Sequence, residues 1–197
     1  MSNTFSGLFL LIVGPSGVGK GTTISLLKKR HPTWYFPISA TTRRARPHER
    51  DGETYHFLSM DAFDEKIRRG EFLEWAWVHG KHKYGVLRSE VFPPLKQGKL
   101  VVREVDIQGF LEIQKHIPKK NLLSFFLLPP PWKVLEKRIR SRAPISESEL
   151  QKRKESMEKE VQKAKACDVH IQTEDGNIDL PAQEIENYLR AHFSHFL

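Results

Sequence analysis

LFLLIVGPSGVGK, residues 8–20, is an unbroken apolar run followed by a glycine-rich loop that ends in a lysine. An apolar run without polar alternation is typical of a central parallel strand covered on both faces. Residues 22–30 carry apolar side chains at helical spacing and three cations in the last turn, where the helix dipole favours positive charge. Strand, glycine loop and helix in this order predict a phosphate-binding loop.

The elements beyond this loop predict an α/β fold. We expect further core strands at residues 100–105, 122–128 and 169–171. Two clear helices are expected at residues 61–69 and 180–193. The charged stretch 133–165 has helical composition, but Ala143-Pro144 divides it into two helices. Because strands alternate with helices, the expected architecture has three layers around a mainly parallel central sheet.

Composition excludes several classes of protein. A chain of 197 residues suits one domain with a buried core, and no linker or repeat divides it. Its 39% hydrophobic and 28% charged residues are not those of a disordered chain, and its longest apolar run is too short to cross a bilayer. The single cysteine, Cys167, excludes a disulfide framework, and the first residues lack the basic region of a secretory signal. We therefore expect a cytoplasmic protein with no membrane partner.

Positive charge is concentrated in two segments. The formal net charge is +8, of which residues 28–50 carry +6 and residues 132–153 carry +4, so the rest of the chain is slightly acidic. Such an excess favours an anionic partner: nucleic acid, an acidic membrane or a phosphorylated small molecule. The sign of the charge alone does not choose among these three.

The glycine loop has a specific chemical capacity. Its backbone N–H groups can converge on a phosphate, and Lys20 can reach the β- and γ-phosphates of a nucleoside triphosphate. Gly21 stands where the usual pattern has serine or threonine, although Thr22 follows, and the Gly-Lys-Gly-Thr order resembles the loop of adenylate kinases. We therefore expect no strong direct metal ligand. Mg²⁺ would be held by water and by the nucleotide's phosphates, with the Thr22 hydroxyl as a candidate protein ligand.

A second anion site is indicated downstream of the loop. Arg43 and Arg46 lie three residues apart, and Tyr55 follows shortly. Guanidinium groups bind a phosphate monoester through two parallel hydrogen bonds and stay charged, so these residue types suit a phosphate grip. A solvated basic loop is the alternative explanation for this segment taken alone.

Several motifs together resemble the guanylate kinase family, in order and at matching spacing, over roughly residues 6–192. They are GPSGVGK (14–20), SATTRRAR (39–46), GETYHF (52–57), GEFLEWA (70–76), VDIQG (105–109), LPP (128–130) and RIRSR (138–142), followed by Arg153. The resemblance implies a P-loop NTPase-type fold and ATP-dependent phosphorylation of GMP to GDP in purine nucleotide metabolism, with dGMP as a further acceptor. It also implies one domain, 1–197, with a core (6–38, 98–131 and 154–192), a GMP-binding subdomain (about 39–97) and a helical lid (about 132–153).

The resemblance assigns roles to particular residues. ATP, carried with Mg²⁺, is expected to bind Arg138 and the loop residues Gly14, Pro15, Ser16, Gly17, Val18, Gly19, Lys20, Gly21 and Thr22. GMP is expected to bind Ser39, Arg43, Arg46, Tyr55, Glu74, Tyr84, Glu104 and Asp106. The catalytic cations would be Lys20, Arg46, Arg142 and Arg153. The Glu74 carboxylate would accept hydrogen bonds from N1–H and the amino group of guanine, a donor pair that adenine does not offer.

Some alternatives and departures remain. Glu104 and Asp106 could instead be acids that cap a strand end, and Arg138 could lie on a solvated helix face. Val86 stands where the family has serine or threonine, so one guanine contact is in question. An inactive guanylate-kinase-like protein-interaction module is the alternative function, but such modules usually have a damaged phosphate loop, and this loop keeps Lys20. Nucleic-acid binding rests only on charge and is not expected. A monomer and a homodimer both remain open.

Overall fold

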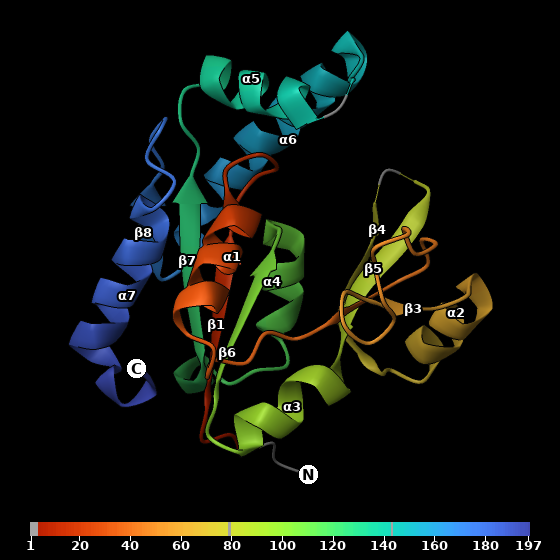
Figure 1. Cartoon of the computed structure of the whole chain (residues 1–197), viewed down its shortest axis with the longest axis vertical. Coiled ribbons are helices and arrows are strands. Elements are labelled where there is room, and N and C mark those ends of the chain that lie inside the picture. The colour runs from red at the N-terminus through yellow and green to blue at the C-terminus, as the bar shows by residue number, and fades with distance from the viewer. Residues whose placement is uncertain (1–3, 79, 143) are drawn as a thin grey trace.

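The computed structural model describes residues 4–78, 80–142 and 144–197, except for the side chain of Arg142. Its central sheet has four parallel strands in the order β6-β1-β7-β8 (Figure 1). These strands are β1 (Leu8–Val13), β6 (Leu100–Val105), β7 (Leu122–Leu128) and β8 (Val169–Gln172). The expected α/β fold with a parallel core is confirmed, and each predicted core strand is present to within one residue.

Strand β1 is apolar throughout because both of its faces are covered. All six residues are buried, and they alternate between two separate apolar clusters. Leu10 and Ile12 belong to the cluster on one face of the sheet, whereas Phe9 and Leu11 belong to the cluster on the other. This arrangement explains why the strand shows no polar alternation.

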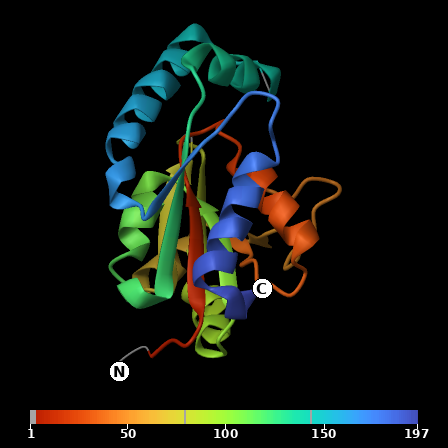
Figure 2. The same cartoon turned by 90° about the vertical axis from the view of Figure 1, so that its left-hand side faces the viewer.

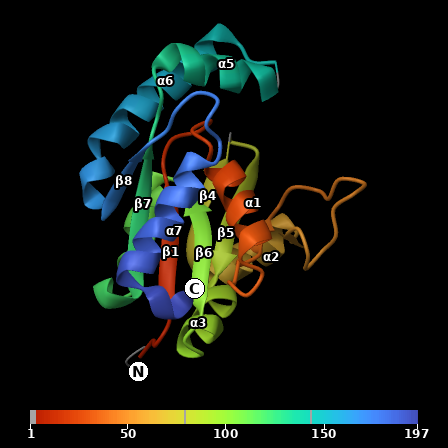
Figure 3. The same ribbon diagram turned by 60° about the vertical axis from the view of Figure 1, so that its left-hand side comes forward.

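Helices cover the two faces as separate layers (Figures 2 and 3). On one face, α1 (Lys20–Arg30) and α7 (Leu180–His192) bury Leu27 and Leu189 against the sheet. On the other face, α4 (Ile107–Ile113) and α3 (Arg88–Lys96) contribute Phe110 and Leu95 to the second cluster. Helices α3 and α4 were not expected from the sequence.

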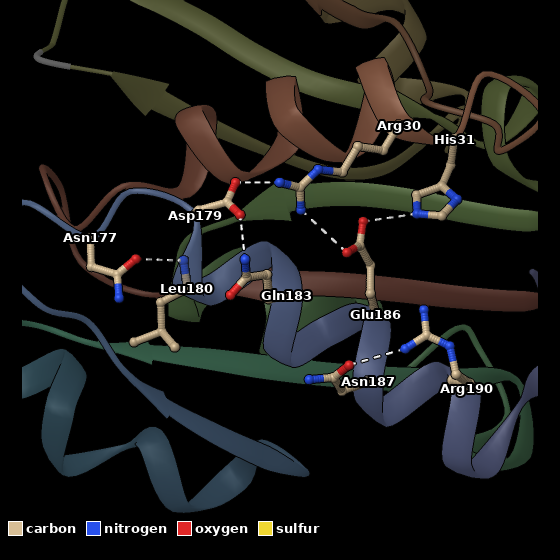
Figure 4. Close-up of polar contacts among 9 residues, drawn as sticks. All are labelled: Arg30, His31, Asn177, Asp179, Leu180, Gln183, Glu186, Asn187 and Arg190. Atoms are coloured by element: carbon tan, nitrogen blue, oxygen red, sulfur yellow. Dashed lines mark hydrogen bonds and ion pairs between the residues drawn. The ribbon is translucent and has the colours of Figure 1, made fainter.

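An ion-pair network joins the end of α1 to α7 (Figure 4). The Arg30 guanidinium donates to Asp179 and, at 3.2 Å, to Glu186, while His31 Nε2 lies 2.9 Å from the same Glu186 carboxylate. The hydrogen bond from Arg30 lowers the pKa of Asp179. The helix that begins at the glycine loop is therefore anchored at its far end by the C-terminal helix.

A second, smaller sheet lies beside the core, to the right in Figure 1. Its order is β3-β2-β5-β4, with β2 (Ser39–Thr41), β3 (His56–Phe57), β4 (Phe72–Val78) and β5 (His82–Leu87). Helix α2 (Met60–Arg68) packs on it through Phe63, whose ring stacks on Phe72 at 4.2 Å. This sheet falls inside the segment assigned to the GMP-binding subdomain.

Glu90 on α3 ties the second sheet to the core. Its carboxylate accepts hydrogen bonds from the Tyr35 hydroxyl (3.1 Å) and from the Ile38 backbone N–H (3.0 Å), and it contacts His56 Nε2 at 3.0 Å. Tyr35 lies beside the edge of the central sheet, whereas Ile38 and His56 lead into the second sheet. Burial and the nearby Glu90 raise the pKa of Tyr35 to about 12. One side chain thus fixes the connection between the two sheets.

Two helices arch over the top of the molecule in Figure 1, above the tip of β7. They are α5 (Trp132–Arg142) and α6 (Glu147–Gln162), and they share a small apolar cluster formed by Leu135, Ile139 and Leu150. The expected break falls between them, with Pro144 outside both helices; Ala143 lies outside the described residues. Three short 3₁₀ helices complete the fold: η1 (Lys119–Asn121), η2 (Ala164–Ala166) and η3 (Ser194–Phe196). Within the described part of the chain, no helix is long and apolar enough to cross a membrane.

Candidate active site

The glycine loop, residues 14–19, joins the end of β1 to the start of α1. Gly17 has φ of +86° and Gly19 has φ of +118°, backbone conformations that favour glycine because it has no Cβ. The loop therefore leads directly into a helix whose first backbone N–H groups carry the positive end of the dipole. This is the geometry that binds phosphate.

Lys20 folds back across the loop. Its Nζ donates to the backbone carbonyl oxygens of Gly14 at 2.6 Å and Pro15 at 3.0 Å. A pocket of about 210 Å³ opens beside it, lined by Ser16, Gly17, Gly19, Lys20, Gly21 and Glu104. The predicted loop residues and one of the predicted acids thus meet in one place.

A second pocket of about 210 Å³ lies between the loop, α5 and the segment after β8. Its lining residues are Gly17, Val18, Gly19, Thr22, Thr23, Arg138, Ser141, Thr173, Glu174, Asn177, Ile178 and Pro181. The Arg138 guanidinium donates to the Glu174 carbonyl oxygen (3.0 Å) and to the Asp175 carboxylate (3.1 Å). Arg138 thus joins α5 to the segment after β8 at the rim of the pocket, and about a quarter of its side chain remains exposed (26%).

A third pocket, which we name the acceptor pocket, has a volume of about 300 Å³. It lies on the other side of Glu104 from the glycine loop. It is lined by Ile24, Phe36, Pro37, Ser39, Tyr55, Tyr84, Val102, Arg103 and Glu104. Glu104 also lines the loop pocket, so its carboxylate stands between the two. Burial raises the pKa of Tyr55 above that of an ordinary phenol.

Arg43 is held beside this pocket by Glu49, a residue that the sequence reasoning missed. Two hydrogen bonds of 2.9 and 2.8 Å join the guanidinium to the carboxylate, and Arg43 Nε donates to the Tyr84 hydroxyl at 3.2 Å. The hydrogen bonds from Arg43 and from the Arg46 backbone lower the pKa of Glu49 to about 2. An acidic residue that follows two nearby arginines was the only signal in the sequence.

Arg46 differs from Arg43 in its surroundings. Its backbone N–H donates to Glu49 at 2.8 Å, but the residue is exposed, and its guanidinium makes no hydrogen bond or ion pair with the residues the structure describes. Because the loop backbone is fixed while the side chain is available, Arg46 is suited to bind an incoming phosphate.

Glu74 is buried and paired with Arg103, a residue that the sequence analysis did not single out. Arg103 Nη2 donates to Glu74 Oε1 at 2.6 Å, and Nη1 donates to Ser39 Oγ at 2.8 Å. Strand β6 reads LVVREV, and the mostly buried cation at its fourth position was the available signal, because such a charge requires a partner.

Two other predicted site residues, Asp106 and Arg153, line none of these three pockets. Asp106 follows β6 and caps the start of α4, where its carboxylate accepts from the Gly109 N–H at 2.7 Å. Arg153 donates to Glu149 at 2.8 Å, and its Nε is buried without a partner among the described residues. The side chain of Arg142 lies outside the described residues. Glu160, also missed, is half-buried and lines a further pocket together with Asp106; burial raises the pKa of the Glu160 carboxyl.

The residues around the glycine loop fit a metal ion that is bound mainly by the phosphates of a nucleotide. Among the described residues, no group of three or more His, Cys, Asp or Glu side chains could hold a metal ion. The hydroxyl of Thr22 is exposed at the start of α1, and the Glu104 carboxylate lines the loop pocket. Such sparse oxygen ligands suit Mg²⁺, which keeps several waters and is bound mainly by phosphates.

A phosphate loop that faces an acceptor pocket across one carboxylate, under two helices, defines a nucleoside monophosphate kinase of the P-loop class. A model of the family described as guanylate kinase matches residues 7–192. The chain belongs to the guanylate kinase family.

Individual relatives agree with this assignment. Guanylate kinase from Trichormus variabilis is 42% identical over 183 residues, which cover 93% of this chain and 90% of that protein. Guanylate kinase from Tropheryma whipplei (strain Twist) is 40% identical over 178 residues, 90% of each chain. The crystal structure of guanylate kinase from Anaplasma phagocytophilum superposes with a TM-score of 0.70 at 28% identity, covering 96% of this chain and 88% of that one.

Proposed function

We propose that this chain transfers the γ-phosphoryl group of ATP to the phosphate of GMP, and of dGMP, in the cytoplasm. The observation that carries the proposal is the position of Glu104, which lines both the loop pocket and the acceptor pocket. Two anion-binding sites that share one wall can bring a donor phosphate and an acceptor phosphate into line. Membership of the guanylate kinase family supports GMP as the acceptor.

The donor side works by positioning and charge. Backbone N–H groups of residues 14–19 and the amino end of α1 bind the β-phosphate region, as expected of such a loop. Lys20 exchanges the carbonyl oxygens of Gly14 and Pro15 for phosphate oxygens, which places its charge where negative charge develops in the transition state. Arg138 and the loop around Glu174 enclose the adenosine part of ATP.

The acceptor side binds a phosphate monoester. Ser39, Tyr55 and Tyr84 supply hydroxyl groups around the acceptor pocket, and Arg43 and Arg46 supply charge. Holding the GMP phosphate here converts a bimolecular reaction into an effectively unimolecular one. No general base is required, because an ionised phosphate oxygen is already the nucleophile.

The lid and the metal complete the proposal. Residues 132–153 would close over the reactants, so that Arg142 and Arg153 reach the transferring group, while the segment 39–97 moves with GMP. Mg²⁺, when bound to ATP, neutralises charge on the phosphate oxygens. Closure excludes water, which protects ATP from hydrolysis.

A coupled assay of ADP production tests the function. GMP and dGMP should support turnover with ATP and Mg²⁺, whereas AMP and UMP should support little. Lys20→Met should abolish turnover, and Lys28→Met, which removes the same charge from the exposed end of α1, should leave it near the wild-type value. Equal rates with AMP and GMP would contradict the guanine assignment. A chain that binds no ATP would instead be the inactive interaction module.

A further inference from the structure

We propose that Arg103 is a specificity-determining residue of the acceptor site, which reads the base of the nucleotide jointly with Glu74. The inference deepens the proposed function and rests on it. It starts from the hydrogen bonds that Arg103 makes to both Glu74 and Ser39, in a place where neither composition nor motif spacing predicted a cation.

Arg103 spans a row of three residues on the second sheet. Ser39 on β2 and Glu74 on β4 are both register partners of Val86 on β5, so the three positions lie side by side across the sheet. Arg103 comes from the core strand β6 and contacts the two outer members, Ser39 Oγ at 2.8 Å and Glu74 Oε1 at 2.6 Å. Its guanidinium therefore reaches across Val86, the middle position, whose side chain has no polar atom.

The two hydrogen-bond partners of the Arg103 guanidinium line different pockets. Arg103 and Ser39 line the acceptor pocket, whereas Glu74 lines another pocket, of about 450 Å³, together with Trp75 and Gly109. A Cβ on Gly109 would lie 3.3 Å from Glu74 Oε2, so the glycine leaves room around the second carboxylate oxygen. A nucleotide that places its phosphate by Ser39 and its base by Glu74 must pass Arg103.

Arg103 retains donors for a ligand. A guanidinium has five N–H bonds, and here one from each Nη is used by Ser39 and Glu74. Arg103 Nε is buried and has no hydrogen-bond partner among the described residues. Buried donors are normally satisfied, so this group is one to which a bound molecule can supply the missing acceptor.

The donor and the acceptor of this pair match guanine. Arg103 offers N–H groups next to the oxygens of Glu74, and guanine presents its O6 acceptor next to its N1–H donor. Adenine presents the reverse order on the corresponding edge, an amino donor next to an unprotonated N1. Arg103 would therefore donate to O6 of guanine while Glu74 accepts from N1–H. With adenine, the amino donor would face the N–H groups of Arg103, and the unprotonated N1 would face the carboxylate of Glu74. This pairing supplies the hydrogen bond that Val86 cannot make.

A structural ion pair is the competing explanation. In that case Arg103 only neutralises the buried Glu74, and its removal would lower stability without changing the choice of base. The two explanations differ in base discrimination, and the test is built on that quantity.

The experiment compares the wild-type protein with Arg103→Met and Arg103→Lys, using GMP, inosine monophosphate and AMP as acceptors. Hypoxanthine keeps O6 and N1–H but lacks the amino group of guanine. We expect Arg103→Met to lower kcat/KM for GMP and for inosine monophosphate by about tenfold to a hundredfold each, mainly through KM. The kcat/KM for AMP should fall less or rise, and KM for ATP should not change. Val86→Thr added to Arg103→Met should recover part of the loss with GMP.

Controls separate the possible failures. A wild-type chain that binds ATP but does not phosphorylate GMP would overturn the proposed function. If the wild-type chain phosphorylates GMP, and a folded Arg103→Met keeps the same ratio of GMP to AMP turnover, the role of Arg103 is overturned while the proposed function stands. If thermal unfolding shows that Arg103→Met does not fold, Arg103→Lys decides, because lysine keeps the charge beside Glu74 but not the forked donors. An unchanged GMP to AMP ratio in that variant would also overturn the proposal, and a reduced ratio with unchanged ATP binding would support it.

Discussion

Glu49 holds Arg43 through two hydrogen bonds, 2.9 and 2.8 Å long, at the mouth of the acceptor pocket. The same carboxylate accepts from the Arg46 backbone, so one acid organises the segment that carries both candidate phosphate-binding arginines. Arg43 is therefore not a loose cation that waits for a phosphate. An incoming phosphate has to share the guanidinium with an anion that is already in place.

This ion pair predicts a pH dependence of stability. The folded protein lowers the pKa of Glu49 from 4.5 to about 2, so the carboxylate stabilises the fold fully above pH 4.5, and that contribution is lost as the pH falls toward 2. Glu49→Gln should flatten the decline in the free energy of unfolding over this interval. Denaturant titrations at several pH values measure it. Glu53→Gln, in the same exposed loop, is the matched control, and a decline as flat as that of Glu49→Gln would contradict the assignment.

Arg46 should matter for turnover far more than cations of equal charge elsewhere. Arg46→Ala should lower kcat/KM for GMP by about a hundredfold or more, because the side chain is expected to align the acceptor phosphate. Lys29→Ala, at the exposed end of α1, should change it by less than about twofold. Steady-state kinetics at fixed ATP measures both. Similar losses of kcat/KM in the two variants would mean that GMP is attracted only by the overall positive charge of the protein.

Gly21 gives a matched pair of substitutions within α1. A Cβ there would lie 3.7 Å from the Glu104 carboxylate, which is ordinary contact, and the backbone is helical, so both alanine and serine fit. Gly21→Ala should raise the free energy of unfolding by about 0.5–1 kcal/mol without changing KM for ATP. Gly21→Ser should also lower KM for ATP with Mg²⁺, because a hydroxyl after the lysine can reach the metal. Equal KM values for the two variants would show that this hydroxyl adds nothing.

Cys167 should be inert in the folded protein. The thiol is buried, and burial raises its pKa to about 12, so it is not ionised at neutral pH. An aromatic disulfide reagent at pH 7.5 should label it only at the rate at which the protein unfolds, and at full speed in denaturant. Rapid labelling of the native protein would show that the site opens locally.

The core could be predicted from the sequence because its elements carry unmixed signals. Strand β1 is purely apolar, the loop after it is rich in glycine, and α1 follows with helical spacing of its apolar residues. The break at Pro144 separates α5 from α6. Helix α3 was missed because it contains Pro93 and Pro94, which ordinarily end a helix; here packing of Leu95 against the core outweighs them. The seven residues of α4 are too few for a periodic pattern.

The second sheet and its partners were harder to predict for a different reason. In β4 the charged Glu74 is buried while Trp75 and Trp77 are exposed, the reverse of the pattern that identifies a strand face. Glu74 is buried because Arg103 neutralises it, and the two are 29 positions apart along the chain. A family resemblance can identify a single site residue such as Glu74. Its ion-pair partner cannot be predicted in this way, because the pairing depends on how the two sheets pack against each other.

The contact of Arg30 with Asp179 and Glu186 also sets an order of events during synthesis. Helix α1 needs α7 to cover Leu27 and to hold its last turn, yet α7 is translated after every strand of the central sheet. A ribosome that has made residues 1–178 therefore carries the complete glycine loop without the helix that secures it. The nascent polypeptide should acquire its affinity for nucleotide only after residues 180–192 leave the exit tunnel.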